Sequence, residues 1–398
     1  MLISRSDRGL IADWWFSVDK VLLGCVLVLM ASGVLFSMAA SPPVAARLGL
    51  EHFHFFTRQL VFLVPAAIVL VLTSLLSPSQ ARRICMLIFI AGLAAMVLTI
   101  FVGPEIKGAH RWLDLGPINV QPSEFAKPAF VVAAAWFLAE GIRRPDMPGL
   151  WISFAMFAAL AGLLVKQPDF GQLVLVSAVF ATLLLVHGIS WIWIFGLAGL
   201  AGGGAVVAFL TFPHVASRVN RFLDPEKHDT FQVDAATQAF NNGGLMGTGP
   251  GGGTAKHILP DAHTDFIPAV IGEEFGFVAS AILIFIIGFI VLRVLLRAMR
   301  VTDPFTVLSL TGLVSLYGFQ SFINLGVNLT LLPAKGMTLP FISYGGSSLI
   351  AMAFSMGLLL AFSRVRVRNT AFHSQIGGCL LYTSPSPRDF SCNLVCRL

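Results

Sequence analysis

The 398-residue chain is 56% hydrophobic and only 12% charged, and its mean hydropathy is +0.83. Soluble domains carry about 25% charged residues, so this composition predicts an integral membrane protein. It excludes a soluble enzyme, a secreted disulfide scaffold and a DNA-binding module. The net charge of +6 does not indicate a nucleic-acid partner, because most basic residues lie at the ends of apolar segments, where they orient helices in a membrane.

Ten apolar runs of about 20 residues, the length that a membrane-crossing helix needs, follow one another along the chain. They lie approximately at Val21–Ala40, Leu60–Leu76, Ile84–Val102, Phe125–Ala139, Leu150–Val165, Gly171–Val186, Trp191–Phe212, Phe275–Leu296, Phe305–Leu329 and Gly345–Phe362. None shows the alternating pattern of a β-barrel strand, so the runs predict an all-α membrane protein with ten transmembrane helices. The fifth and sixth runs are separated only by Lys166 to Phe170 and are expected to form a tight hairpin.

Basic residues cluster at the N-terminus and after every even-numbered run except the sixth. They are Arg5, Arg8, Lys20, Arg82, Arg83, Arg143, Arg144, Arg293, Arg297, Arg300, Arg364, Arg366 and Arg368. The positive-inside rule therefore predicts that both termini are cytoplasmic. We interpret the first run as a span and not as a cleaved signal, because it has full span length and no small-residue cleavage pattern.

Residues 1–368 are expected to form a single polytopic membrane domain, followed by a disordered C-terminal tail over 369–398. The Ser- and Pro-rich stretch 377–398 differs from everything before it and resembles a cloning read-through, so we interpret it as non-native. Three of the five cysteines lie in that stretch. Cys25 and Cys85 lie in apolar runs, where a thiol behaves as a small hydrophobe, and the cysteines show no metal-site spacing.

The predicted orientation places two substantial loops outside, at residues 103–124 and 213–266. The second has about 50 residues, far more than the usual connection between packed helices, which indicates a functional loop. Its charges are also typical of a solvated surface. A glycine-rich stretch from Gly243 to Gly253, followed by Lys256, allows backbone N–H groups to converge on an anion, although a flexible linker has the same composition. The stretch lacks the Walker pattern, so it implies no nucleotide chemistry.

His263, Thr264 and Asp265 come immediately before an apolar segment that contains Glu273 and Glu274. A single helix that included both Asp265 and Glu273 would present them on nearly the same face. Ionisable groups that enter a membrane are functional by default. A helix N-cap is the structural alternative for Asp265, and the two roles are compatible.

The shorter outer loop carries Lys107 and Arg111 beside Trp112. Tryptophan at this position fits an interfacial anchor, and the two cations suit a lipid head-group phosphate. In the tight hairpin, Lys166 and Asp169 are expected to form a local ion pair.

Five sequence blocks, at matching positions among the ten spans, resemble the SEDS family of FtsW, RodA and SpoVE, over about residues 15–365. They are GAHRWLDLGPINVQPSEFAKP, KQPDFG, DAATQAFNNGGLMGTGPGGG, HTDFIPAVIGEEFG and KGMTLPFISYGGSS. The last block and KHILPDAHTDFI are more similar to the cell-division branch of the family than to its elongation branch. The chain departs from the family pattern at Pro268, where phenylalanine is usual, and at Asp261, where many members have glutamate. Pro268 would lie in a first helical turn, where proline is tolerated, so the departure affects local geometry only.

The resemblance implies a peptidoglycan glycosyltransferase that polymerises lipid II into glycan strands at the outer face of the bacterial cytoplasmic (inner) membrane, at the division septum. It implies Asp265 as the essential carboxylate. The chemistry requires a base for the attacking sugar hydroxyl and cations for the departing lipid pyrophosphate. The candidate substrate-binding residues are Lys107, Arg111, Arg218, Arg221, Lys256, His263, Glu273 and Lys335.

The resemblance also implies partners, and it leaves undecided whether the enzyme uses a divalent cation. The expected partners are undecaprenyl-pyrophosphate-linked glycan, a class B penicillin-binding transpeptidase and other divisome proteins. A divalent cation, Mg²⁺ or Mn²⁺, is compatible with stabilising the pyrophosphate, although no ligand cluster in the sequence demands one.

Three other functions remain open from the sequence. A lipid II flippase would carry buried charges and broken helices in its spans, whereas the predicted spans carry almost no ionisable residue apart from Glu273 and Glu274. A non-catalytic scaffold that recruits a transpeptidase, and an elongation role within the same family, are the other two.

Overall fold

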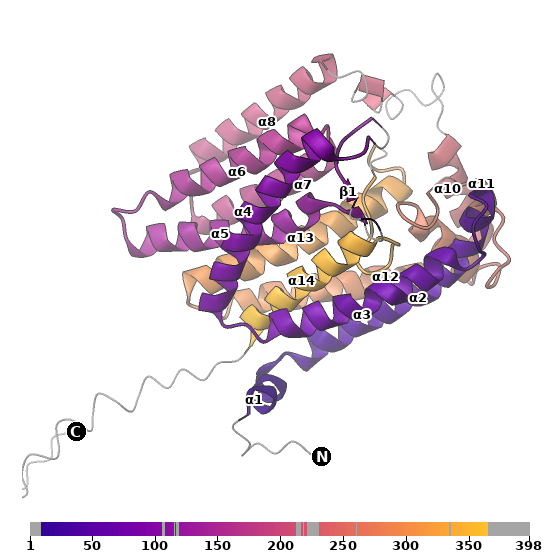
Figure 1. The fold of residues 1–398 in the computed structure, drawn as a ribbon, viewed down its shortest axis with the longest axis horizontal. Helices are drawn as coiled ribbons and strands as arrows, with labels where there is room; N and C mark the ends of the chain where they lie inside the picture. Colours follow the sequence, from indigo (N-terminus) through magenta and orange to yellow (C-terminus); the bar gives the residue numbers. More distant parts are fainter. Residues whose placement is uncertain are drawn as a thin grey trace, which may run out of the picture. The chain divides into compact units, whose positions relative to one another are not determined.

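The computed structural model describes residues 9–105, 108–114, 116, 119–211, 216–217, 219–220, 231–259, 261–333 and 336–364. These residues are mainly helical (Figure 1). The helices are α1 (Leu10–Ser17), α2 (Lys20–Arg47), α3 (His54–Ser74), α4 (Pro78–Val102), α5 (Pro122–Arg143), α6 (Gly149–Lys166), α7 (Phe170–His187), α8 (Trp191–Thr211), α10 (Phe231–Gly243), α11 (Ala255–Ile258), α12 (Ile267–Ala298), α13 (Pro304–Asn328) and α14 (Gly346–Ser363). Strands β1 (Leu113–Asp114) and β2 (Asn119–Val120) form a small antiparallel hairpin.

The predicted spans are helices. Within the described part of the chain, nine helices are long and apolar enough to cross a membrane, namely α2 to α7 and α12 to α14. The remaining run coincides with α8. The largest difference concerns α12, which begins at Ile267 and not at Phe275. The apolar run stops at Glu273 and Glu274, but both carboxylates are buried, so the helix extends past them.

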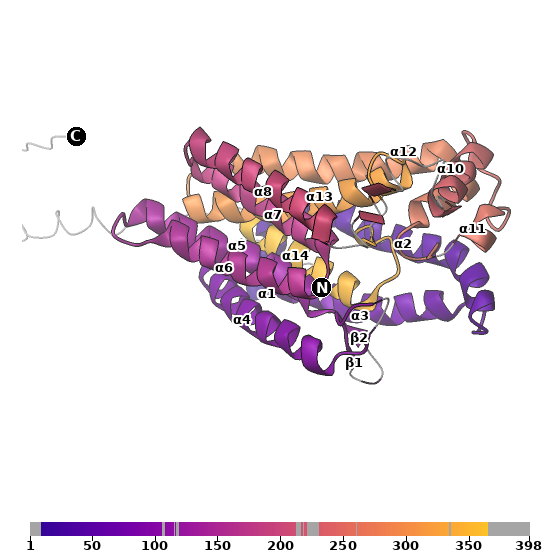
Figure 2. The same cartoon turned by 90° about the horizontal axis from the view of Figure 1, so that it is seen from above.

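Three spans form the centre of the bundle. Most of α5, α13 and α14 is buried, whereas the surrounding spans expose more of their surface. α13 packs on α5, α7 and α12, and α14 packs on α3 (Figures 1 and 2). Buried alanines along α5, such as Ala129 and Ala133, allow the close helix approach that membrane proteins use in place of a hydrophobic driving force.

Three of the basic residues predicted to be cytoplasmic, Arg293, Arg143 and Arg364, connect the ends of neighbouring helices. Arg293 pairs with Asp19 at 2.9 Å and thereby joins α12 to the start of α2. Arg143 pairs with Asp303, which joins the end of α5 to the start of α13. Arg364 donates to the Leu75 carbonyl oxygen at 3.2 Å. These contacts join the ends of six spans in three pairs.

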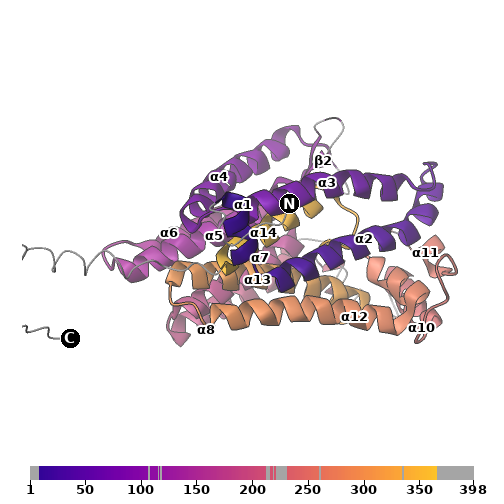
Figure 3. The same cartoon turned by 90° about the horizontal axis from the view of Figure 1, so that it is seen from below.

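The opposite end carries α10 and α11 beside the α2–α3 connection (Figure 3). Arg47, the last residue of α2, donates to the Leu259 carbonyl oxygen at 2.8 Å. The sequence did not predict α10, because its buried face consists of small alanines (Ala235, Ala236, Ala239) and its mean hydropathy is low. α1, which precedes the first apolar run, was also not predicted. The tail 369–398 lies outside the described residues.

Gln238 provides a test of the orientation, because it is exposed on α10. In a chain whose five cysteines are replaced, Gln238→Cys is expected to react with a membrane-impermeant maleimide added to spheroplasts. Asp146→Cys, in the exposed α5–α6 connection, is the matched control and should react only after permeabilisation. Labelling with the reverse pattern would invert the assigned topology.

Candidate active site

α12 is broken at Gly276, whose φ is +78°, nine residues after its start at Ile267. At the break, the Phe277 backbone N–H donates to the Gly244 carbonyl oxygen at 2.9 Å, and the Thr248 N–H donates to the Glu273 carbonyl oxygen at 2.9 Å. The glycine-rich stretch therefore pairs with helix backbone groups that the kink releases. A Cβ at Gly276 would clash with that stretch, so the break requires glycine.

The Glu273 carboxylate lies inside the glycine-rich stretch. It accepts from the backbone N–H groups of Thr254 at 2.9 Å and Ala255 at 3.0 Å, and from the Asn242 side chain at 3.3 Å. A Cβ at Gly253 would lie 2.7 Å from its Oε2 atom. Backbone N–H groups thus converge on an anion, as the glycine pattern predicts, but here the anion belongs to the chain itself.

Glu274 holds the next part of the stretch. Its side chain is fully buried, accepts from the Gly251 N–H at 3.0 Å and forms an ion pair with Lys256. The Lys256 side chain is only 6% exposed. Because α11 turns this lysine inward, the structure places it in a buried pair and not on a surface that faces substrate.

Asp265 stands just outside α12. The N-cap of the helix is Phe266, so Asp265 is neither the N-cap nor on the same helix as Glu273, contrary to two expectations from the sequence. Asp265 is partly exposed, whereas Phe266 and Ile267 are buried. A Cβ at Gly336 would lie 3.1 Å from the Asp265 Oδ2 atom. The carboxylate therefore lies against the segment that follows α13.

His263 packs among aromatic rings near Asp265. Its ring centroid lies 4.2 Å from that of Phe55 and 5.5 Å from that of Tyr344. The Tyr344 N–H donates to the His263 carbonyl oxygen at 2.9 Å. Burial raises the pKa of the Tyr344 hydroxyl, and the hydrogen bond with Arg58 opposes that rise. Arg58 is an exposed cation that the sequence analysis missed. Its position just before the second apolar run, at the end of that span predicted to face outward, was the available signal.

Arg111 joins the outer hairpin to the turn between α6 and α7. It donates to the carbonyl oxygens of Gln167 at 2.9 Å and Pro168 at 2.5 Å, and its guanidinium lies 3.8 Å from the Asp169 carboxylate. Burial raises the pKa of Asp169, and Arg111 opposes the shift. Asp169 thus pairs with Arg111 and not with Lys166, which is exposed.

A buried polar cluster in α5 and α7 was also missed. Lys127 donates to Glu124 at 2.9 Å and to the Gln172 side chain at 2.6 Å, and Gln172 donates to Glu124 at 2.8 Å. Lys127 and Glu124 are 2% and 5% exposed. The expectation that the spans contain almost no charge is therefore wrong for α5. Pro122, which is typical of a first helical turn, marked a helix start before Glu124.

The other predicted cations, Lys107, Arg218, Arg221 and Lys335, lie outside the described residues. Within the part of the chain that the structure describes, no group of three or more His, Cys, Asp or Glu side chains is arranged to hold a metal ion.

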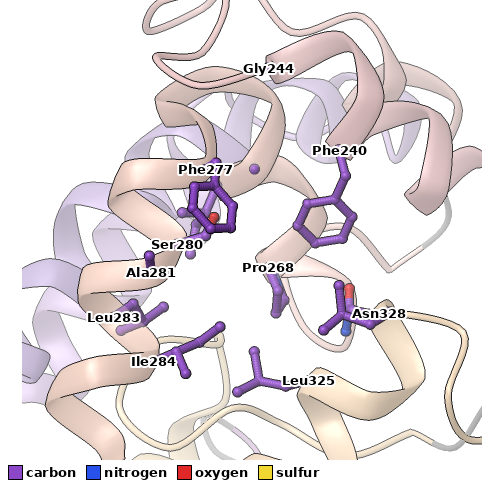
Figure 4. A pocket seen from close by; sticks show the side chains of 13 residues that line it. Phe240, Gly244, Pro268, Phe277, Ser280, Ala281, Leu283, Ile284, Leu325 and Asn328 are labelled. Carbon is purple, nitrogen blue, oxygen red and sulfur yellow. The ribbon is translucent and has the colours of Figure 1, made fainter.

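The described residues form an apolar groove of about 250 Å³ (Figure 4). It lies between α10, α12 and α13, and Phe240, Pro268, Phe277 and Leu325 line it. Phe277 is 63% exposed, so an apolar side chain forms part of the outer surface here. Asn328 lines the groove, and its amide donates to the Asp265 carbonyl oxygen at 2.9 Å. Asn328 therefore links the groove to the backbone of Asp265.

Known proteins with similar sequences and structures agree on one family. The family model for FtsW, RodA and SpoVE, described as "Cell cycle protein", matches residues 19–368. A Caulobacter vibrioides protein named "Probable peptidoglycan glycosyltransferase FtsW" is 42% identical over 364 residues, which cover 91% of this chain and 93% of that protein.

Two solved structures share the fold. A chain from the structure called "Structural coordination of polymerization and crosslinking by a peptidoglycan synthase complex" matches with a TM-score of 0.71 at 30% identity, over 88% of this chain and 98% of that chain. Thermus thermophilus RodA, a rod shape determining protein, matches with a TM-score of 0.64 at 28% identity, over 88% and 97%.

Proposed function

We propose a function from one premise: the chain belongs to the FtsW, RodA and SpoVE family of cell cycle proteins. It is a multi-pass bacterial membrane protein and a peptidoglycan glycosyltransferase. The proposed substrate is lipid II, which the enzyme joins into undecaprenyl-pyrophosphate-linked glycan strands. The proposed location is the outer face of the cytoplasmic membrane at the division septum.

The observation that carries the chemistry is the position of Asp265. Its carboxylate is partly exposed at the predicted outer end of the bundle, while the neighbouring backbone is held by buried side chains. In the proposed reaction Asp265 takes the proton from a sugar hydroxyl of one substrate. That oxygen forms the glycosidic bond to the anomeric carbon of the other substrate, whose bond to the lipid pyrophosphate breaks.

The leaving pyrophosphate requires positive charge, and the structure narrows the candidates. Lys256 is committed to Glu274, and the Glu273 carboxylate is occupied by the glycine-rich stretch. Arg111 is likewise committed to the Gln167 and Pro168 carbonyl oxygens and to Asp169. We therefore assign the contact to the remaining predicted cations, Lys107, Arg218, Arg221 and Lys335, which lie outside the described residues, and we add the exposed Arg58. A Mg²⁺ or Mn²⁺ ion carried in with the substrate would supply the same stabilisation.

The apolar groove supports a lipid-linked substrate. An isoprenoid chain needs an apolar surface, and the groove offers one beside Asn328, which holds the Asp265 backbone. A pyrophosphate at the membrane surface would then lie above the groove, within reach of the outer loops.

The proposed partner is a class B penicillin-binding transpeptidase, within a larger set of divisome proteins. The support is the matching chain from a peptidoglycan synthase complex that polymerises and crosslinks. The name of the 42%-identical relative favours division over elongation. Two features of the described residues favour a flippase, since transporters carry buried charges and broken helices in their spans. They are the buried Glu124–Lys127 pair and the break in α12 at Gly276.

We expect the purified full chain to convert fluorescent lipid II into glycan polymer, visible as a ladder on a gel, and to do so faster with its transpeptidase partner. A flippase would instead move lipid II across vesicle bilayers without forming polymer. A parent chain that forms no polymer with or without the partner, but translocates lipid II, would contradict the proposed reaction.

A further inference from the structure

We propose that Asn324 and Asn328 are positioning residues for Asp265, an inference that rests on the proposed function. The two asparagines lie one turn apart on α13, and each is only 1% exposed. Both side-chain amides donate to the backbone carbonyl oxygen of Asp265, at 3.0 Å from Asn324 and 2.9 Å from Asn328. Two donors on one acceptor fix the direction of the Asp265 peptide group as well as its distance from α13.

The same amides also fix the surface that faces the carboxylate. Asn324 donates its second N–H to the Met337 carbonyl oxygen at 2.6 Å, and Met337 follows Gly336. Gly336 lies against the Asp265 carboxylate, because a Cβ there would be 3.1 Å from Oδ2. Asn324 therefore holds both the backbone of Asp265 and the segment on the other side of its carboxylate, and Asn328 donates to the Asn324 carbonyl oxygen at 2.9 Å.

Asp265 needs this pair of asparagine hydrogen bonds, here called the clamp, because it lies before the first residue of α12. The N-cap Phe266 makes no side-chain capping bond, and the preceding turn begins at Asp261 with a φ of +54°. A base outside a regular helix keeps its place only through tertiary contacts. Displacing a reacting group by about 1 Å costs on the order of 10²-fold in rate, so the clamp matters for turnover more than for substrate capture.

Gln320 supplies a matched control on the same helix. It is 1% exposed, and its amide donates to the Thr338 carbonyl oxygen at 3.1 Å. It therefore binds the same segment after α13 through the same kind of bond, but to Thr338 and not to Asp265. Gln320→Met removes a buried amide and keeps the shape of the side chain.

The first measurement separates positioning from folding. Asn324→Leu and Asn328→Leu are each expected to lower kcat for lipid II polymerisation by about 10- to 100-fold, with KM within about threefold of the parent value. Gln320→Met should reduce thermal stability in detergent to a similar extent but leave kcat within about threefold. Asn328→Gln, which retains the donor, should recover part of the loss. Equal kcat losses in all three helix variants would reduce the asparagines to a structural role.

The second measurement does not depend on activity, so it distinguishes failure of this inference from failure of the proposed function. In a chain without other cysteines, the thiol of D265C is titrated with a charged methanethiosulfonate reagent. Adding Asn324→Leu or Asn328→Leu is expected to change the labelling rate by about fivefold or more, whereas adding Gln320→Met should not. Unchanged rates with both asparagine variants would overturn the proposal, whatever the chain polymerises.

Discussion

Asp265→Asn is expected to lower lipid II polymerisation by about 10²- to 10⁴-fold, the usual contribution of a general base. Asparagine has nearly the same size, and the backbone carbonyl that Asn324 and Asn328 hold is unchanged, so the variant should insert and fold like the parent. It cannot accept the proton of the sugar hydroxyl. The measurement is the initial rate of glycan synthesis from fluorescent lipid II, alongside the thermal transition in detergent.

The control is Asp114→Asn, an exposed carboxylate on β1 that also lies in an outer loop. Its rate should stay within about threefold of the parent, because removing a solvated charge changes little. If Asp265→Asn polymerises at the parent rate, Asp265 is not the base. Asp261 would then be the next carboxylate to test, since Glu273 and Glu274 are buried and occupied.

The spans were predictable because length and hydropathy dominate in a membrane, where each helix satisfies its own backbone. The start of α12 at Ile267 could not be predicted in this way. Glu273 and Glu274 interrupt the apolar run, and the groups that make their burial possible, such as the Thr254 N–H, come from a stretch about 20 residues earlier. A prediction from local composition has no access to that pairing.

The glycine-rich stretch shows the same limit at the site. Its pattern correctly indicated backbone N–H groups that converge on an anion. Glu273 lies just before the predicted span and gave no local sign that it would be that anion. Asn324 and Asn328 were overlooked for a related reason. Two amides four residues apart in an apolar span are a recognisable polar face, but their partner, the Asp265 carbonyl, is a backbone group that no residue type reveals.

Lys256→Met is expected to destabilise the chain by about 3–5 kcal/mol, because it leaves the Glu274 carboxylate buried without its cation. The double variant Lys256→Met with Glu274→Gln should recover most of that loss, since replacing both members of a buried pair is often nearly neutral. Thermal unfolding in detergent measures both. Arg144→Gln is the control: its pair with Glu140 is on the surface, with the arginine 75% exposed, and should contribute less than about 1 kcal/mol.

The same variants decide between two roles for Lys256. A lysine that contacted pyrophosphate would, on mutation, lower the polymerisation rate at unchanged stability, and the added Glu274→Gln would not restore the rate. A lysine that fastens the glycine-rich stretch to α12 gives the opposite result: stability falls first, and the double variant recovers stability and rate together. The second outcome is expected, because Gly251 and Lys256 both bind Glu274 just before the turn that leads to Asp265. A single Lys256→Met chain as stable as the parent would show that the pair does not hold the stretch.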